Sequence, residues 1–356
     1  MIYIIAQLWG NFQKNHAGYP HICHLLEKEY PHKYKVVDCK PPTEKSNNML
    51  KNILHGIYNK LTNYRTFRNY LFEICRETLN GLNSGDSVFL LEYNVPACHQ
   101  YELACYIKAN YYGVKICAMT HLTPSLLQKI PKYEKKLIMW DKPVDMHLTL
   151  GSSLTSFLVK CGIPSYKIST GFHAVDLNYY MRDIPITTIP KKLTIITIGA
   201  IQRDYKLLSE IVKKRCSDVN WIICKGHNKV DSLFENVENV SLMGFLQEDE
   251  LRKMMLNSDI SLCVLEDTVG SNVITTSMAM GLGVIVSDVG SIRDYCSNEN
   301  AIFCNNSVDS FVNAIDVVKN RTDILLNMKS ASIKMSKNLS IQETNTWFSN
   351  LFVKDC

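Results

Sequence analysis

Basic side chains and a turn of small residues occur where a phosphate-bearing ligand could be held. Arg203 and Lys206 follow the apolar run 193–198. A guanidinium and an ammonium group there could hold a diphosphate and offset charge on a leaving group. The turn of Gly270, Ser271 and Asn272 precedes a short predicted helix, whose unpaired N–H groups and positive dipole end also suit a phosphate. The alternatives are surface basic residues without a ligand, and a glycine-bounded helix that binds nothing.

A histidine follows a predicted strand in the first half of the chain. The apolar run 114–118 precedes His121, and parallel α/β sheets hold their ligands beyond the carboxyl ends of such strands. His121 is therefore a candidate ligand contact, and the alternative is a capping or buried structural histidine. Nearer the N-terminus, a loop with Gly18 lies between a predicted strand at 2–8 and a helical pattern, which is typical of a mononucleotide-binding βαβ start.

The elements around the 270–272 turn form one α/β unit. A helix over 273–280 is expected to end at Gly281 and Gly283, because glycine accepts the positive φ of a helix end. An apolar strand over 284–287 and a second turn at 288–291 follow. Pro185 and Pro190 predict a linker at 181–192, after which the β-rich run 193–198 opens a second sheet.

Length and composition favour a globular protein of two domains. The chain has 356 residues, of which 46% are apolar and 21% charged. No apolar run approaches the roughly 20 residues of a membrane helix, and the first ten residues resemble a buried strand more than a signal peptide. The 13 cysteines are scattered and never spaced as CxxC. They favour reduced thiols and a cytoplasmic location over a disulfide framework or a zinc site.

Charge is concentrated in the first half of the chain. Residues 1–170 hold 20 Lys and Arg against 12 Asp and Glu, whereas the remainder holds 19 against 22. This asymmetry favours an acidic partner such as anionic lipid or a phosphorylated acceptor. Within it, residues 49–79 alternate apolar and basic positions with a helical period, so they predict either a peripheral membrane helix or a helix packed on its own sheet. No nucleic-acid motif accompanies them, and we expect no nucleic-acid partner.

The order of residues from Ser277 to Ile292 resembles a known donor site. It is similar to the segment Glu-Ala-Met-Ala-x-Gly-x-Pro-Val, followed by two apolar residues and (Ser/Thr)-Asp-x-Gly-Gly, of the family 4 retaining glycosyltransferases. The run from Gly162 to Asp176 resembles the segment that precedes that family's domain crossover, with Ala174 in place of a glycine. The resemblance implies an α/β protein of GT-B architecture, with two facing Rossmann-like domains, parallel sheets and a C-terminal helix returning to the first domain.

That architecture implies the domain limits. We expect an acceptor-side domain at 1–180, a linker at 181–192, a nucleotide-sugar-binding domain at 193–338, and a final helix at 339–356. The aromatic residues Trp347, Phe348 and Phe352 are expected to pack that helix on the first domain.

The resemblance also implies an activity: transfer of a sugar from a nucleoside-diphosphate sugar to a hydroxyl of a glycan, lipid-linked or other acceptor, with retention, in glycan or polysaccharide biosynthesis. The donor is a substrate, and no cofactor is expected. No Asp-x-Asp follows a strand, so we expect no required metal ion. The implied catalytic residues are His121, Arg203 and Lys206. The implied donor-binding residues are Gly18, Gly199, Gly244, Phe245, Glu266, Asp267, Gly270, Ser271, Asn272, Val273 and Ser277.

One departure from the family pattern leaves an alternative open. The family has two glutamates that bracket the donor loop and helix, and they fall at Val269 and Ser277 here. Ser277 could bind a ribose hydroxyl more weakly, Glu266 or Asp267 could supply the missing carboxylate, or backbone N–H groups could bind the sugar alone. The alternative function is therefore a non-catalytic relative that binds a sugar nucleotide or a partner protein. An NAD enzyme is disfavoured because no GxGxxG follows the first strand.

Overall fold

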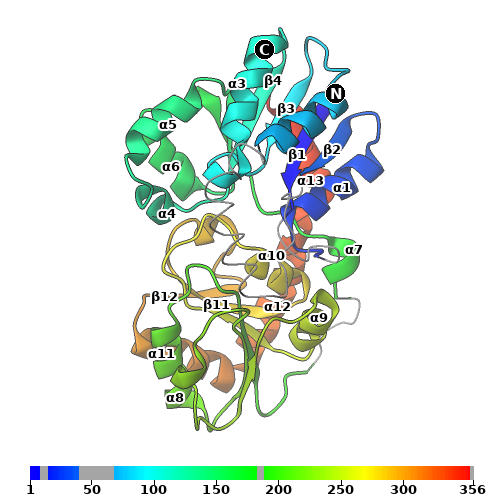
Figure 1. The fold of residues 1–356 in the computed structure, drawn as a ribbon. Coiled ribbons are helices and arrows are strands. Elements are labelled where there is room, and N and C mark those ends of the chain that lie inside the picture. Colours follow the sequence, from blue (N-terminus) through cyan, green and yellow to red (C-terminus); the bar gives the residue numbers. More distant parts are fainter. Residues whose placement is uncertain (9–14, 40–67, 183–187, 353–356) are drawn as a thin grey trace, which may run out of the picture.

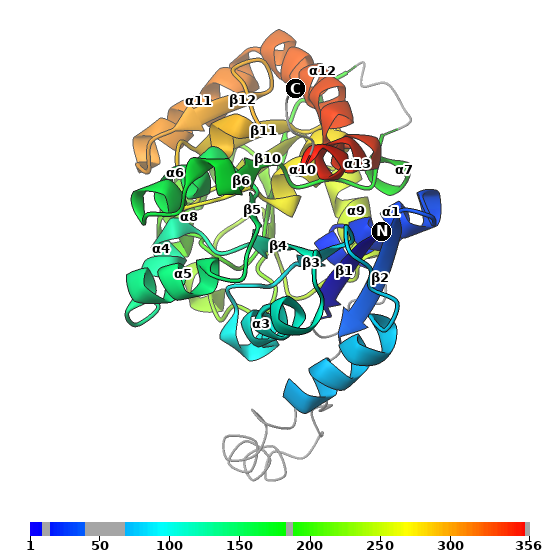
Figure 2. The same ribbon diagram turned by 90° about the horizontal axis from the view of Figure 1, so that it is seen from above.

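A computed structural model describes residues 1–8, 15–39, 68–182 and 188–352, which form two α/β domains (Figures 1 and 2). The first sheet has the order β2-β1-β3-β4-β5-β6 and the second β12-β11-β10-β7-β8-β9. The first contains β1 (Ile2–Gln7), β2 (Tyr34–Cys39), β3 (Ser87–Leu90), β4 (Lys115–Thr120), β5 (Met146–Thr149) and β6 (Ile168–Thr170). The second contains β7 (Thr194–Ile198), β8 (Asn220–Cys224), β9 (Val240–Met243), β10 (Ile260–Cys263), β11 (Gly283–Ser287) and β12 (Ala301–Cys304). All strand pairings are parallel, which confirms the expected fold class.

Helices cover both faces of each sheet, as parallel strands require. Successive side chains of a strand point to opposite faces, so Ile5 packs in one core of the first domain while Ile4 packs in the other. The helices of the first domain are α1 (Tyr19–Glu29), α3 (Gln100–Asn110), α4 (Pro124–Gln128), α5 (Tyr133–Asp141), α6 (Ser152–Lys160) and α7 (Leu177–Tyr180). Those that follow are α8 (Tyr205–Arg215), α9 (Glu248–Leu256), α10 (Asn272–Ala279), α11 (Val308–Asn320), α12 (Thr322–Ser336) and α13 (Ile341–Asn350).

The last helix, α13, lies against the first domain although it follows the second (Figure 1). The Phe348 ring meets the Phe89 ring of β3 edge to face, with centroids 4.9 Å apart. Trp347 donates from Nε1 to Ser169 Oγ at 2.8 Å. Phe352 is partly exposed, and Lys115 of β4 lies over its ring. The chain therefore crosses between the domains twice, once near α7 and once between α12 and α13.

The two domains also touch directly along one side of the space between them. Gly151 of the first domain lies so close to Ser291 of the second that a Cβ on Gly151 would be 2.3 Å from the Ser291 Cβ. Beside it, Ser152 donates from its backbone N–H to Asp294 at 2.6 Å. Tyr295 accepts the His173 N–H at 2.7 Å and donates to the Leu150 carbonyl at 2.5 Å. These contacts hold the domains in one orientation.

Four further expectations from the sequence can be compared with the described residues. The segment 49–79 is described only from residue 68, where a helix runs to residue 78 and buries Leu71 and Cys75 in the first core; the rest lies outside the described residues. Of the expected linker, residues 183–187 lie outside them too. The cysteines of the described segments are unpaired thiols, and none of the helices there is long and apolar enough to cross a membrane.

Candidate functional site

A cavity of about 540 Å³ lies between the carboxyl edge of the first sheet and the start of α10 in the second domain. Parallel strands bring the loops after β1, β4 and β6 to this edge, which is where α/β proteins bind ligands. Three residues from the sequence prediction line it together: Gly18, His121 and Asn272. The other lining residues are Gln7, Leu8, Asn15, Tyr19, Pro20, His21, His24, Glu92 and His173.

Five polar atoms on the cavity wall are buried and have no hydrogen-bond partner among the described residues. They are Gln7 Oε1, Tyr19 Oη, His121 Nε2, His173 Nδ1 and Asn272 Oδ1. Buried polar atoms are nearly always hydrogen-bonded, and leaving one unpaired costs roughly 1–3 kcal/mol. This group combines acceptors with atoms that can donate or accept, which is the set that the hydroxyl groups of a sugar would satisfy.

Two histidines and a tyrosine lie close together on this wall. The centroids of His121 and His173 are 6.0 Å apart, and each ring lies within 6 Å of the Tyr19 ring. Burial, helped by the neighbouring His121, lowers the pKa of His173 to about 3, so this imidazole is neutral at physiological pH. Burial likewise raises the pKa of Tyr19 well above its usual value, so its hydroxyl keeps its proton. The wall therefore offers neutral hydrogen-bonding groups.

The second domain contributes the start of α10. Gly270 has a φ of +123°, and a Cβ there would lie 2.3 Å from the Tyr295 hydroxyl, so only glycine fits. Ser271 follows as the N-cap residue without a side-chain cap, and Asn272 begins the helix one residue earlier than expected. Ser271, Asn272 and Val273 are half-buried. Because the first N–H groups of a helix have no partner within it, this turn can receive an anion beside the cavity.

The expected basic pair is split. Arg203 lies in the loop after β7 and folds back over Gly199, donating from Nε to the Ile198 carbonyl and from Nη1 to the Ile201 carbonyl, both at 3.2 Å. These two hydrogen bonds leave its other N–H groups available for a ligand. Lys206 is exposed on the first turn of α8. The structure thus holds Arg203 in a fixed place and leaves Lys206 at the surface.

A residue that sequence reasoning missed links this loop to the first domain. Gln202 donates from Nε2 to Ser125 Oγ at 2.7 Å and to Thr123 Oγ1 at 3.2 Å. The loop of Gly199 and Arg203 therefore borders the space between the domains. A glutamine beside the predicted basic pair carried no distinctive sequence signal.

An aromatic pair lies at the carboxyl edge of the second sheet, after β8 and β9. Phe245 is 54% exposed and stacks on His227, with ring centroids 5.2 Å apart and planes 5° apart. Gly244, next to it, is also exposed and has open space around it. Phe245 was predicted as a donor contact, and its stacking partner His227 was not foreseen.

The possible substitutes for the missing glutamates differ in availability. Val269 and Ser277 are buried, and the Ser277 hydroxyl donates to Ser261 of β10 at 2.9 Å, so it faces the core and not a ribose. Asp267 accepts the backbone N–H groups of Ser125 and Thr268. Glu266 is exposed. Of the two acidic candidates, Glu266 is thus the carboxylate that can turn toward a ligand.

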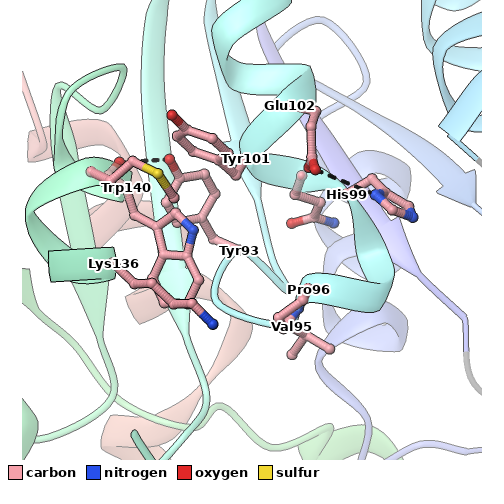
Figure 3. A pocket seen from close by; sticks show the side chains of 10 residues that line it. Tyr93, Val95, Pro96, His99, Tyr101, Glu102, Lys136 and Trp140 are labelled. Atoms are coloured by element: carbon pink, nitrogen blue, oxygen red, sulfur yellow. Dashed lines mark hydrogen bonds and ion pairs between the residues drawn. The ribbon is translucent and has the colours of Figure 1, made fainter. Parts of the chain in front are cut away.

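A second, smaller cavity of about 230 Å³ lies in the first domain between α3 and α5 (Figure 3). Tyr93 donates there to the Trp140 carbonyl at 2.6 Å, and His99 lies 3.5 Å from the Glu102 carboxylate. None of the residues predicted as functional lines it, so the 540 Å³ cavity is the candidate site.

Comparison with known proteins gives one family match and several structural matches. Residues 192–319 match the family model described as "Glycosyl transferases group 1". No curated protein sequence matches the chain. HepE from Anabaena in complex with UDP and glucose aligns with a TM-score of 0.71 and 12% identity over 98% of each chain. A glycosyltransferase from Rickettsia africae aligns at 0.68 and 14%, over 100% of this chain and 99% of that one.

Sucrose-phosphate synthase from Thermosynechococcus elongatus is similar as well, with a TM-score of 0.73 and 11% identity over 99% of this chain and 98% of that one. At such low identities these likenesses concern the fold. The two six-stranded parallel sheets, and the alignment of nearly the whole chain with these structures, show that the chain has the GT-B fold.

Proposed function

We propose that the protein is a retaining glycosyltransferase that moves a sugar from a nucleoside-diphosphate sugar to an acceptor hydroxyl. The observation that carries the proposal is the 540 Å³ cavity, where Gly18 and His121 of one domain meet Asn272 of the other beside five unpaired buried polar atoms. A donor sugar would satisfy these atoms. The match of residues 192–319 to group 1 glycosyltransferases supports the same reaction class.

The donor would extend from this cavity across the second domain. Its diphosphate would lie between the free N–H groups of Arg203 and the N–H groups at Ser271, Asn272 and Val273, with Lys206 adding charge from α8. Its base would lie near Phe245 and His227, whose exposed stack offers an aromatic surface. Glu266, which is exposed, would accept hydrogen bonds from the ribose.

In this arrangement the chain would stabilise the departing nucleoside diphosphate electrostatically. Charge that develops on the leaving phosphate is offset by Arg203 and by the start of α10, groups that are positioned before the reaction. His121, together with neutral His173, would orient the sugar. We place no metal ion in this transfer and no cofactor beyond the donor itself.

The acceptor side is the first domain. Its excess of basic residues supports a glycan or lipid-linked acceptor that carries negative charge, used in glycan or polysaccharide biosynthesis by a cytoplasmic enzyme that contacts an anionic membrane peripherally. Co-sedimentation with vesicles that contain anionic lipid, compared with neutral vesicles, tests the membrane contact.

Calorimetry followed by activity assays tests the main proposal. The nucleoside diphosphates UDP, GDP and ADP are titrated before any activity assay. The series begins with UDP because the similar HepE structure contains UDP. The matching sugar nucleotides are then assayed for hydrolysis and for transfer to simple acceptors. We expect binding of one diphosphate and slow donor hydrolysis, and an absence of diphosphate binding would contradict the proposal.

The burial of Ser277 and the apolar Val269 favour a second candidate, a relative that binds a sugar nucleotide without catalysis. Binding without hydrolysis or transfer, across several donors and acceptors, would select this candidate over the enzyme.

A further inference from the structure

Three side chains that can bind a metal ion meet where the first loop touches the crossover between the domains. His16 Nδ1 and His21 Nε2 both lie 2.9 Å from Oδ2 of Asp176. The three ligand atoms lie within 4.8 Å of one another. His16 belongs to the loop before α1, His21 to the first turn of α1, and Asp176 caps α7. Residues about 155 positions apart in the chain therefore present three ligands to one point.

The spacing of these atoms suits a small transition-metal ion. Zinc binds imidazole nitrogen and carboxylate oxygen at about 2.0–2.2 Å, so ligand atoms in a tetrahedral shell lie roughly 3.3 Å apart. To admit the ion, the two observed separations of 2.9 Å must widen slightly, and the two imidazole nitrogens, which lie within 4.8 Å of each other, must adjust toward the same spacing. Two imidazoles with one carboxylate favour zinc or a related ion over magnesium or calcium, which prefer oxygen ligands.

Two of the three ligands, Asp176 and His16, are also held in orientation by a further contact, as metal ligands usually are. The second carboxylate oxygen of Asp176 accepts the Tyr179 N–H at 3.3 Å. The His16 ring stacks on the Tyr179 ring, with centroids 3.7 Å apart and planes 4° apart. The Tyr179 hydroxyl in turn donates to Asp249 at 2.5 Å. The site is thus built into two elements and fixed by their packing.

A further acidic side chain lies beside the three ligands. The Glu248 carboxyl is near the Ala17 N–H and His21. Glu248 Oε1 is buried and has no hydrogen-bond partner in the described segments. The positively charged Arg252 side chain lies over the Tyr179 ring and donates to the Tyr179 carbonyl. A divalent ion would offset the charge of the Asp176 carboxylate.

We propose that His16, His21 and Asp176 form a binding site for a zinc-like divalent ion, which ties the loop at 15–18 to the crossover segment. Water completes the coordination. His21 also lines the 540 Å³ cavity, so the bound ion also holds this part of the cavity wall in place. This role is separate from the proposed diphosphate contacts at Arg203 and α10, and it stands whether or not the protein transfers sugars.

Metal titration of the full chain, without an affinity tag and after treatment with a chelator, tests the proposal. We expect one Zn²⁺ ion to bind with a Kd in the micromolar range or below. His16→Gln and His21→Gln each leave a side chain that can donate to Asp176 but remove an imidazole ligand. Because loss of an outer-sphere partner already costs 10–100-fold in affinity, we expect each loss of a ligand to cost at least about 100-fold. His32→Gln, an exposed histidine after α1, is the control and should bind like the wild type.

X-ray absorption at the zinc edge of the wild-type protein gives a readout that does not depend on any variant folding. Imidazole and oxygen ligands without sulfur are the expected result. Sulfur in the coordination shell would assign the ion to the free thiols and overturn the proposal. So would a wild-type protein that binds no zinc at millimolar concentration, or a His16→Gln, His21→Gln double variant with an unchanged isotherm.

Discussion

Replacement of Arg203 by alanine tests the electrostatic basis of the proposed donor site. Two of its N–H groups donate to the carbonyls of Ile198 and Ile201, which fixes the guanidinium over Gly199 and leaves the others for a phosphate. A hydrogen bond to a charged group contributes about 1.5–3 kcal/mol. Loss of one such bond should therefore raise the Kd of the nucleoside diphosphate roughly 10- to 150-fold.

Isothermal titration calorimetry with the preferred nucleoside diphosphate measures this change. Lys206→Ala is expected to have a smaller effect, because exposed ion pairs contribute about 0–1 kcal/mol and Lys206 is exposed. Arg215→Ala is the matched control, since it removes an arginine paired with Asp316 at the other end of α8. The Tm of each variant separates lost binding from lost folding. A folded Arg203→Ala protein with a Kd within about twofold of wild type would refute the placement of the diphosphate. Such a change in binding free energy is smaller than the contribution of a single hydrogen bond to a charged group.

Three further changes probe the cavity, the core beneath it and its surroundings. His121→Ala should lower kcat/KM about 10- to 100-fold in steady-state kinetics. The Tm should change little, since Nε2 has no protein partner to lose among the described residues. An unchanged kcat/KM would remove His121 from the site. Ser277→Glu should destabilise the fold by about 3–5 kcal/mol in urea unfolding, because a carboxylate would be buried beside Ser261 without a partner, whereas wild-type stability would mean that the helix can turn this position to solvent. The pKa of Glu248 is raised to about 7, so its proton stabilises the folded state below pH 4.5, and this contribution is lost as pH rises through 7. The free energy of unfolding should therefore vary less with pH in Glu248→Gln. Identical pH profiles would contradict the raised pKa.

The sequence was sufficient for the parts of the fold that depend on local pattern. Apolar runs such as 193–198 and 284–287 are strands buried on both faces, and the glycines after the short helix end it where expected. The turn at Gly270 was also foreseeable, because small residues precede a short helical pattern there and glycine accepts a positive φ. These features depend on a few adjacent residues, so they can be predicted without knowledge of the tertiary structure.

The rest depended on contacts between distant segments. Ser277 looked available for a ribose, but the parallel register of β10 and β11 places Ser261 beneath α10 and turns the hydroxyl inward. Gln7, Tyr19 and His173 join the cavity wall only because the loops after three strands converge. A polar Gln7 at the end of an apolar strand was a usable signal, since polar residues at such positions commonly face a ligand site. For His173, only its unpaired ring nitrogen in the folded chain marks it as a candidate ligand contact.

The cavity is itself a product of domain closure, and one tyrosine explains why. The Tyr295 hydroxyl belongs to the second domain, yet it accepts from His173 and donates to Leu150 in the first. The same hydroxyl lies where a Cβ of Gly270 would be, so it sets the turn that presents Asn272. The two sides of the cavity are therefore positioned by a single group. The proposed donor site and the orientation of the domains therefore depend on one another, and any motion that separates the domains must also move Asn272 away from the rest of the cavity wall.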